Sequence, residues 1–213
     1  MSVVPARSRS GIRSGSAFVA AALLIFVTGC GGPPSASSTI PAGPASAAPQ
    51  AVVHLLRLMS DRLTLMHDVA RTKWNANRPV GDPEREQALL HEMEEKGQEH
   101  GLDPEFTRAF FAAQIAAARQ IQEADLARWR AEGRGPFRDT PDLVSLRRRI
   151  DGLNRALLGA LADARPRLGE AGVRVQLQRW AGEALVGDGI TDDVRSAALA
   201  PLEVPRPGSP PQR

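Results

Sequence analysis

The chain has 213 residues, 42% of them hydrophobic, so it is long and apolar enough for one globular domain and too apolar for a disordered protein. Its formal charge of +3 comes from three arginines in the first 29 residues, which contain no acid; without them, 24 basic residues balance 24 acidic ones. A neutral body lacks the positive surface that binding to a phosphate backbone needs, so we expect no nucleic-acid partner, and any anion site has to be local.

The N-terminus has the order of an export signal. The three arginines precede an apolar run, 17–27, which ends in Val27-Thr28-Gly29-Cys30. The run is short for a membrane span, so we predict a cleaved signal peptide over residues 1–29 and an exported, periplasmic protein. The tetrapeptide resembles a bacterial lipobox, which implies that Cys30 is lipidated and anchors the protein to the membrane. The alternative is plain cleavage nearby, which leaves Cys30 as a free thiol; as the only cysteine, it cannot form an internal disulfide.

Composition divides the rest of the chain into a folded domain and two flanking segments. Residues 30–50 are rich in Pro, Gly, Ser and Ala and carry no charge, so we predict a flexible tether. Residues 201–213 contain five prolines and are predicted to be a disordered tail. The folded domain is therefore expected between residues 51 and 200.

The apolar period within this domain is helical throughout, and no run alternates convincingly at period two, so we predict an all-α fold of about six helices. Asp82-Pro83 and Asp103-Pro104 each combine an N-cap with a proline at the first helical position, and Thr140-Pro141 starts a later helix. Prolines at positions 79 and 166 are expected to end the first and the fourth helix. The expected helices span about residues 51–76, 83–100, 104–130, 141–165, 171–186 and 191–200.

Two cations stand eleven residues apart on the first predicted helix. Eleven residues make three helical turns, so Arg62 and Lys73 project from one face about 16 Å apart, a gap that two long side chains and a small anion bridge. Asp82, Arg85 and Glu86 follow directly after the next turn signal. This arrangement predicts an anion pocket built on helices.

Other chemistries have little support in the sequence of the domain. The four histidines have no metal-ligand spacing, and Glu95 stands where a zinc-binding helix starting at His91 needs its second histidine. Cys30 lies outside the domain, no Gly-rich turn is available for a nucleotide phosphate, and no serine lies in a nucleophile-elbow pattern. We therefore expect neither a metal nor a cofactor.

The polar series Arg62, Lys73-Trp74 and Asp82-x-x-Arg85-Glu86 resembles that of the all-helical chorismate mutases. Four stretches resemble the exported subclass of these enzymes in particular: LMSDRLTLMHDVARTKWN, GDPEREQALL, LDPEFTRAFFAAQI and ARQIQEADLARW. The resemblance runs from about residue 51 to 157 and agrees with the export signal. It implies an isomerase that converts chorismate to prephenate by a unimolecular Claisen rearrangement, with no covalent intermediate and no cofactor.

The resemblance also implies which residues bind the dicarboxylate substrate. Arg62 and Arg147 would each grip a carboxylate, because a guanidinium binds a carboxylate through two hydrogen bonds. Arg85 would close or order the pocket. Glu86, with the backbone near Asp82, would take the ring hydroxyl of the substrate.

Two further residues would be catalytic by the same resemblance. Lys73 and Gln122 would face the ether oxygen, on which negative charge builds in the transition state, and preorganised donors aimed at developing charge lower the barrier. Some exported relatives have glutamate at the position of Gln122; a carboxyl must be protonated to donate, whereas an amide donates at any pH. The exported subclass implies a complete active site within one chain, and a homodimer.

Ala118 departs from the family pattern, which usually has a small hydroxyl residue one turn before the glutamine. The departure puts one carboxylate contact in doubt and predicts weaker substrate binding rather than loss of catalysis. Gln114, one turn earlier on the same face, is a candidate substitute.

Each of these residues also has an ordinary interpretation, since a single Arg or Lys on a helix is usually a solvated surface charge. The competing hypothesis is a non-catalytic helical periplasmic lipoprotein, a binding or scaffold module that keeps the fold. A helical adaptor for a partner chain is a third interpretation, which predicts a large exposed apolar patch.

Overall fold

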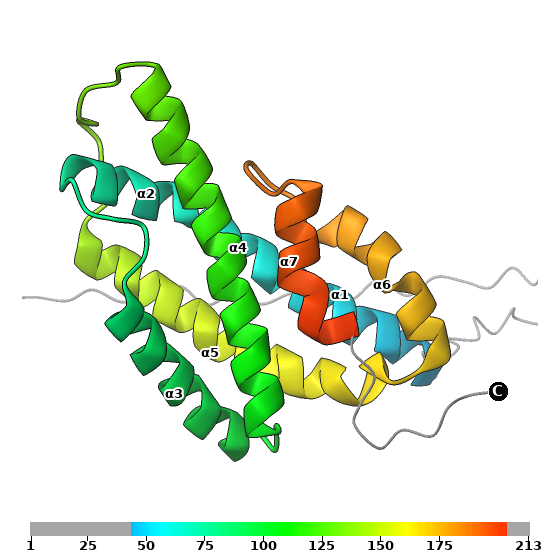
Figure 1. The fold of residues 1–213 in the computed structure, drawn as a ribbon. Helices are drawn as coiled ribbons and strands as arrows, with labels where there is room; N and C mark the ends of the chain where they lie inside the picture. The colour runs from blue at the N-terminus through cyan, green and yellow to red at the C-terminus, as the bar shows by residue number, and fades with distance from the viewer. Residues whose placement is uncertain (1–43, 204–213) are drawn as a thin grey trace, which may run out of the picture. The chain divides into compact units, whose positions relative to one another are not determined.

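The computed structural model describes the backbone of residues 44–203 and the side chains of residues 49–203. This part of the chain forms seven α-helices and contains no strand, which confirms the all-α class (Figure 1). The predicted signal peptide, Cys30, most of the predicted tether and residues 204–213 lie outside the described residues. The helices are α1 Pro44–Thr64, α2 Met66–Asn75, α3 Pro83–Glu99, α4 Pro104–Ala131, α5 Leu143–Leu168, α6 Ala171–Ala184 and α7 Asp192–Glu203.

Two helices organise the packing. The first, α1, contacts α5 and α6, while α4 crosses α2, α3 and α7 (Figure 1). The apolar stripe of α1 is completely buried between its neighbours, because burial of large aliphatic side chains is the main driving force for packing amphipathic helices. Its fully buried members are Val52, Leu55, Leu56, Met59 and Leu63. No helix within residues 44–203 is long and apolar enough to cross a membrane.

The segment predicted as one helix over 51–76 begins earlier and is divided. Its helix starts at Pro44, so the last seven residues of the predicted tether are helical. A turn at Leu65 separates α1 from α2, but Leu65 keeps helical dihedral angles (φ −66°, ψ −13°) and its carbonyl still accepts from Val69 N at 3.1 Å. The interruption is one residue wide, so α2 continues from α1 and carries Lys73.

Two prolines predicted to lie beyond helix ends are inside helices. Pro166 is within α5, which continues to Leu168, and Pro201 is within α7, which continues to Glu203. A proline so close to the end removes only one or two hydrogen bonds, and one more turn buries Leu168 and Leu202 in the core. The prediction that Pro166 ends the fourth helix was therefore wrong, and the first three residues of the predicted tail are helical.

Aspartate caps set the starts of the next helices along the chain. Asp82 Oδ1 accepts from Arg85 N at 3.3 Å, and Asp103 Oδ1 accepts from Phe106 N at 2.8 Å, as the two Asp-Pro signals predicted. For α5 the cap is Asp142, which accepts from Ser145 N at 2.8 Å, and not Thr140. These caps determine the residues at which α3, α4 and α5 begin.

A small aromatic cluster holds the far end of α2. Trp74 packs edge to face on Trp129 of α4, with ring centroids 5.8 Å apart, and Trp129 packs on Phe137 at 4.6 Å. Asn75 exchanges two hydrogen bonds of 2.8 Å with the backbone of Phe137. The loop after α4 is thereby tied to the last residues of α2.

Candidate active site

A cavity of about 340 Å³, here named the inner cavity, lies where α1 to α5 face one another. Residues far apart in the sequence meet in it, because α5 packs along α1, α3 contacts α5 and α4, and α4 crosses α2 and α3 (Figure 1). Seven of the eight residues predicted to act on the substrate line it: Arg62, Lys73, Asp82, Arg85, Glu86, Ala118 and Gln122. The eighth, Arg147, lies in an adjoining cavity.

Arg62 is a buried cation at the floor of the inner cavity, with 4% of its surface exposed. Its Nε donates to Asn154 Oδ1 at 2.9 Å, and its Nη1 donates to the carbonyl of Gln114 at 3.3 Å. Desolvation by burial lowers the pKa of Arg62 to about 10, so the group stays charged at neutral pH. Both partners are neutral, which leaves a positive charge available to an anion.

Lys73 is half-buried, and its ammonium donates to the carbonyl of Val80. Desolvation lowers the pKa of Lys73, while the nearby carboxylates of Asp82 and Glu86 oppose that shift. An ammonium has three donors, so the bond to Val80 fixes its place and leaves other N–H groups for a ligand. The lysine lines both the inner cavity and the adjoining one.

Gln122 and Ala118 are one turn apart on the buried face of α4. Gln122 Nε2 donates to the Ala118 carbonyl at 3.1 Å and approaches Met66 Sδ at 3.7 Å, whereas its Oε1 is buried without a hydrogen-bond partner among the described residues. Ala118 lines the cavity with a methyl group and supplies no hydroxyl. Gln114 is not the substitute, because its side chain bonds to the Ala198 carbonyl on α7 at 3.1 Å and does not line the cavity.

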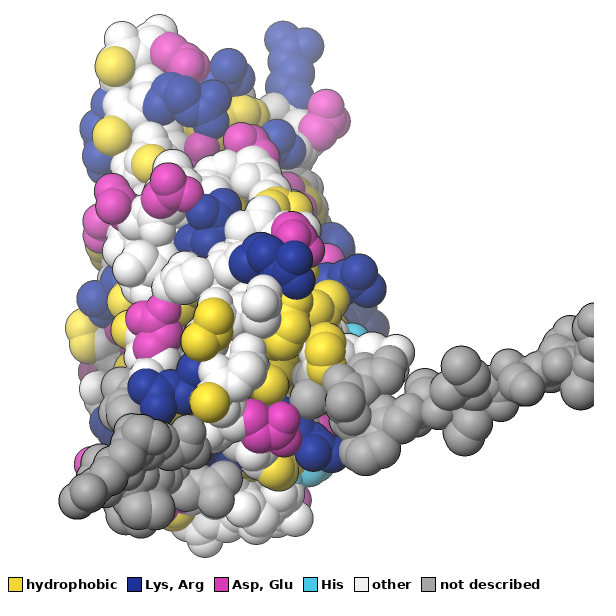
Figure 2. Space-filling view, turned by 90° about the vertical axis from the view of Figure 1, so that its right-hand side faces the viewer, with side chains coloured by type: hydrophobic (Ala, Val, Ile, Leu, Met, Phe, Trp, Pro, Cys, Tyr) yellow, Lys and Arg dark blue, Asp and Glu magenta, His cyan; other side chains and the backbone are white. Residues whose placement is uncertain are grey.

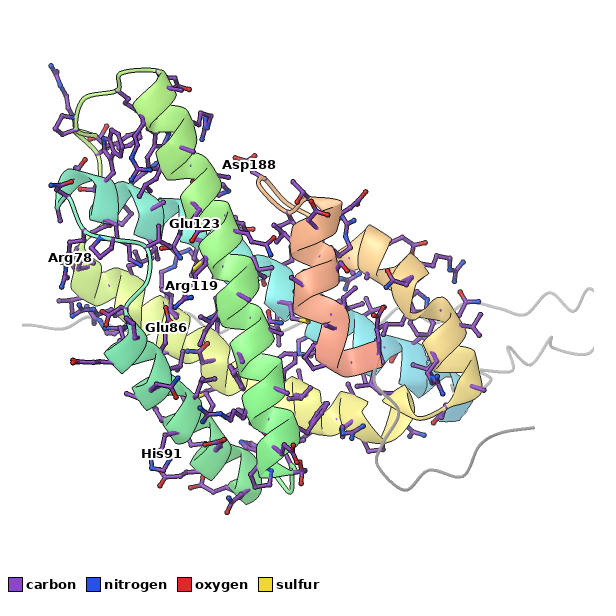
Figure 3. All side chains as sticks on the ribbon, in the orientation of Figure 1. Arg78, Glu86, His91, Arg119, Glu123 and Asp188 are labelled. Carbon is purple, nitrogen blue, oxygen red and sulfur yellow. The ribbon has the colours of Figure 1, made fainter. Side chains whose placement is uncertain are left out.

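Glu86 is held by a residue that the sequence analysis did not identify. Arg119 on α4 donates to both of its carboxylate oxygens, through Nε at 3.0 Å and through Nη2 (Figure 3). Glu86 Oε1 also accepts from Asp82 N at 3.3 Å, so it supports the first turn of α3. The carboxylate is therefore fixed at the cavity wall, where it forms its ion pair with Arg119 and acts on Lys73 only from a longer distance.

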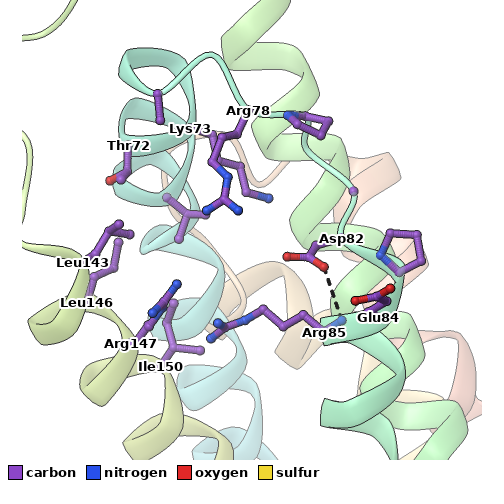
Figure 4. A pocket seen from close by; sticks show the side chains of 15 residues that line it. Thr72, Lys73, Arg78, Asp82, Glu84, Arg85, Leu143, Leu146, Arg147 and Ile150 are labelled. Atoms are coloured by element: carbon purple, nitrogen blue, oxygen red, sulfur yellow. Dashed lines mark hydrogen bonds between the residues drawn. The ribbon is translucent and has the colours of Figure 1, made fainter.

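The adjoining cavity, here named the outer cavity, has a volume of about 590 Å³ and opens between the end of α2 and the starts of α3 and α5. Lys73, Arg78, Arg85 and Arg147 point into it, with Arg85 reaching from α3 toward Arg147 on α5 (Figure 4). None of the three arginines forms an ion pair with any residue in the described part of the chain. Unpaired cations around a cavity are suited to a ligand with carboxylates.

The concentration of positive charge is confined to the two cavities. On the face shown in Figure 2, basic and acidic side chains are interspersed and do not gather by sign. Within residues 44–203, no group of three or more His, Cys, Asp or Glu side chains is arranged to hold a metal ion. The two cavities thus offer cations and an amide, the groups suited to an anionic ligand.

Comparison with known proteins agrees with this chemistry. The sequence profile of the family Chorismate mutase type II matches residues 53–123. The crystal structure of chorismate mutase from Burkholderia thailandensis matches with a TM-score of 0.65 and 35% sequence identity, over 72% of this chain and 99% of that one. The chain belongs to the chorismate mutase type II family. The resemblance inferred from the polar series and the quoted stretches is therefore confirmed.

Two curated relatives in this chorismate mutase family are named as secreted proteins. The secreted chorismate mutases of Mycolicibacterium smegmatis and Mycobacterium tuberculosis are each 28% identical, over 60% and 57% of this chain. The chain spans 71% and 62% of their respective lengths. Their names agree with the export predicted from the N-terminus.

Sequence reasoning missed three residues of this chorismate mutase site. Nothing in the sequence distinguishes Arg78 and Arg119 from other arginines. Whether they reach the cavities depends on how the α2–α3 loop and α4 pack near α3. Asn154 had a weak signal, since it lies seven residues after Arg147 and four after Ile150, on one face of α5. Only the packing of α5 on α1 brings it to Arg62.

Proposed function

We infer that this protein is an exported chorismate mutase, an isomerase that converts chorismate to prephenate by a Claisen rearrangement without a covalent intermediate. The observation that carries the inference is the convergence of Arg62, Lys73 and Gln122 on one inner cavity in a member of this family. Such a reaction needs a held conformer and donors for developing charge, and these residues supply both. No metal or cofactor is part of the proposal.

Lys73 and Gln122 are proposed as the catalytic donors to the ether oxygen of the substrate. The lysine is half-buried and held by a backbone carbonyl. The amide is buried, with one N–H donated to Ala118 O and the other directed at Met66 Sδ, so to donate to the ether oxygen it gives up only the weak contact with sulfur. A preorganised donor in a dry site contributes about 3 kcal/mol of transition-state stabilisation. Holding the chair-like conformer adds a proximity contribution.

Binding of the two carboxylates is divided between the cavities in this proposal. Arg62 takes one carboxylate at the floor of the inner cavity. Arg85, which lines both cavities, and Arg147, which lines the outer one, take the other. Glu86 and the backbone near Asp82 accept the ring hydroxyl, and the fixed position of Glu86 supports that role.

Ala118 is proposed to weaken substrate binding without removing catalysis. Its methyl group lines the inner cavity where relatives usually have a hydroxyl, so one hydrogen bond to a carboxylate is missing. A water or backbone group is the expected replacement.

The cellular location is also part of the proposal. The relatives' names support export, and we propose in addition that Cys30 is lipidated and tethers the mature protein to the membrane from the periplasmic side. A homodimer is proposed from the family resemblance alone. The hypothesis of a non-catalytic lipoprotein is not favoured, because the named relatives are enzymes.

The proposed function is tested by following the loss of chorismate absorbance with the purified protein and with Lys73→Ala. The wild type is expected to accelerate the loss, and removal of one transition-state donor is expected to lower kcat roughly a hundredfold or more. Equal rates for the two proteins would sink the enzyme assignment.

A further inference from the structure

The environment of Arg62 has an unusual charge balance. The side chain is 4% exposed, yet no carboxylate in the described part of the chain lies within ion-pair distance of it. Its only hydrogen-bond partners there are the amide oxygen of Asn154 and the carbonyl of Gln114. A buried charge without a counter-ion is costly, so folded proteins usually provide a carboxylate at such a place.

Asn154 determines which edge of the guanidinium is free. It lies on α5 with 1% of its surface exposed, and its Oδ1 accepts from Arg62 Nε at 2.9 Å. The Nε edge is therefore occupied. Nη2 donates to no atom among the described residues, and Nη1 has a single bond at 3.3 Å, which leaves the Nη1–Nη2 edge to meet a ligand end-on.

We propose that Asn154 is the positioning residue of Arg62: it fixes the plane of the guanidinium and, being neutral, leaves the positive charge for a carboxylate of the substrate. The inference rests on the proposed function and deepens it. An aspartate in the same place would form a salt bridge with Arg62, would stabilise the free protein, and would compete with the substrate for the same charge. The substrate thus supplies the missing counter-ion.

The experiment compares Asn154→Asp, Asn154→Ala and wild type by chorismate kinetics and thermal unfolding. For Asn154→Asp we expect KM to rise about tenfold or more, kcat to stay within about threefold, and the thermal midpoint not to fall. For Asn154→Ala we expect a lower thermal midpoint and a smaller rise in KM, because the guanidinium of Arg62 loses the hydrogen bond that orients it but keeps its charge. Asn77→Asp is the matched control, since it adds the same charge in the exposed α2–α3 loop, where Asn77 has a φ of 49° that aspartate tolerates.

Each result decides the inference. A KM for Asn154→Asp within twofold of wild type, equal to that of Asn154→Ala, or matched by Asn77→Asp would overturn it. If Asn154→Asp does not fold, an unchanged KM in Asn154→Ala overturns it and a raised KM at nearly constant kcat supports it. Absence of turnover in the wild type would instead refute the proposed function, so the two failures are distinguishable.

Discussion

Replacing Gln122 by glutamate changes the proposed ether donor by a single group. In the wild type, Gln122 Nε2 donates to the Ala118 carbonyl at 3.1 Å, and the side chain is 5% exposed. An ionised glutamate would place an acceptor against that carbonyl and would have no hydrogen to offer the ether oxygen. Only the protonated form of the variant can therefore take over the donor role.

The size of the effect follows from these contacts. Loss of one preorganised donor costs about 2.7–4 kcal/mol, or roughly 10²–10³ in kcat. Burial beside Met66 and Ala118 is expected to raise the pKa of the introduced carboxyl above that of an exposed glutamate. Above that pKa the protonated fraction falls about tenfold per pH unit, so kcat of Gln122→Glu should fall as pH rises and recover toward acid.

The assay is kcat for chorismate between pH 4.5 and 8.5, in the wild type and in variants at two positions of α4. The wild type and Gln120→Glu, which makes the same chemical change at an exposed position of that helix, are expected to have similar, broad profiles. Gln122→Met, which has no donor, is expected to be slow at every pH. A broad, wild-type-like profile in Gln122→Glu would refute the assignment of Gln122 as the ether donor.

Four further substitutions test other parts of the site and fold. Lys73→Ala is expected to lower kcat with little change in KM, whereas Arg62→Ala also raises KM, because it removes a ground-state contact; identical kinetic patterns would contradict the division of roles. Ala118→Ser is expected to lower KM severalfold by restoring a hydroxyl, and an unchanged or higher KM would mean that no contact is missing there. Burial of the His67 ring opposes protonation, but hydrogen bonds to the α6–α7 loop and to Asp125 (2.5 Å) outweigh it and raise the pKa of His67. The protonated ring therefore stabilises the fold fully below about pH 6.5, and this stabilisation is lost as pH rises through the raised pKa. His67→Gln should therefore lower the thermal midpoint more at pH 5.5 than at pH 8.5, and an equal loss at both would contradict this linkage.

Features that depend on neighbouring residues in the sequence were predictable. The Asp82 and Asp103 caps involve partners three residues away, and the Arg62–Lys73 spacing needs only the helical repeat, so these patterns located the helix starts and one wall of the inner cavity. Features decided by tertiary burial were not predictable. The helix passes Pro166 because Leu168 is buried by other helices, a benefit that local propensity does not contain.

The same distinction applies within the site. The Arg119–Glu86 ion pair joins residues 33 positions apart, and the Arg62–Asn154 bond joins residues 92 apart. Both depend on how α4 and α5 cross the earlier helices, which a single sequence does not specify. Arg147 was predicted as a binding residue, and its place in the outer rather than the inner cavity also follows from where α5 begins.

The most direct test of the central claim is product formation by the purified wild-type protein. Chorismate loss and prephenate formation are measured together, with no metal or cofactor added. The proposed function predicts prephenate in a one-to-one ratio to the chorismate consumed, at a rate far above that of the uncatalysed rearrangement. Folded protein that binds chorismate but forms prephenate no faster than buffer alone would contradict it.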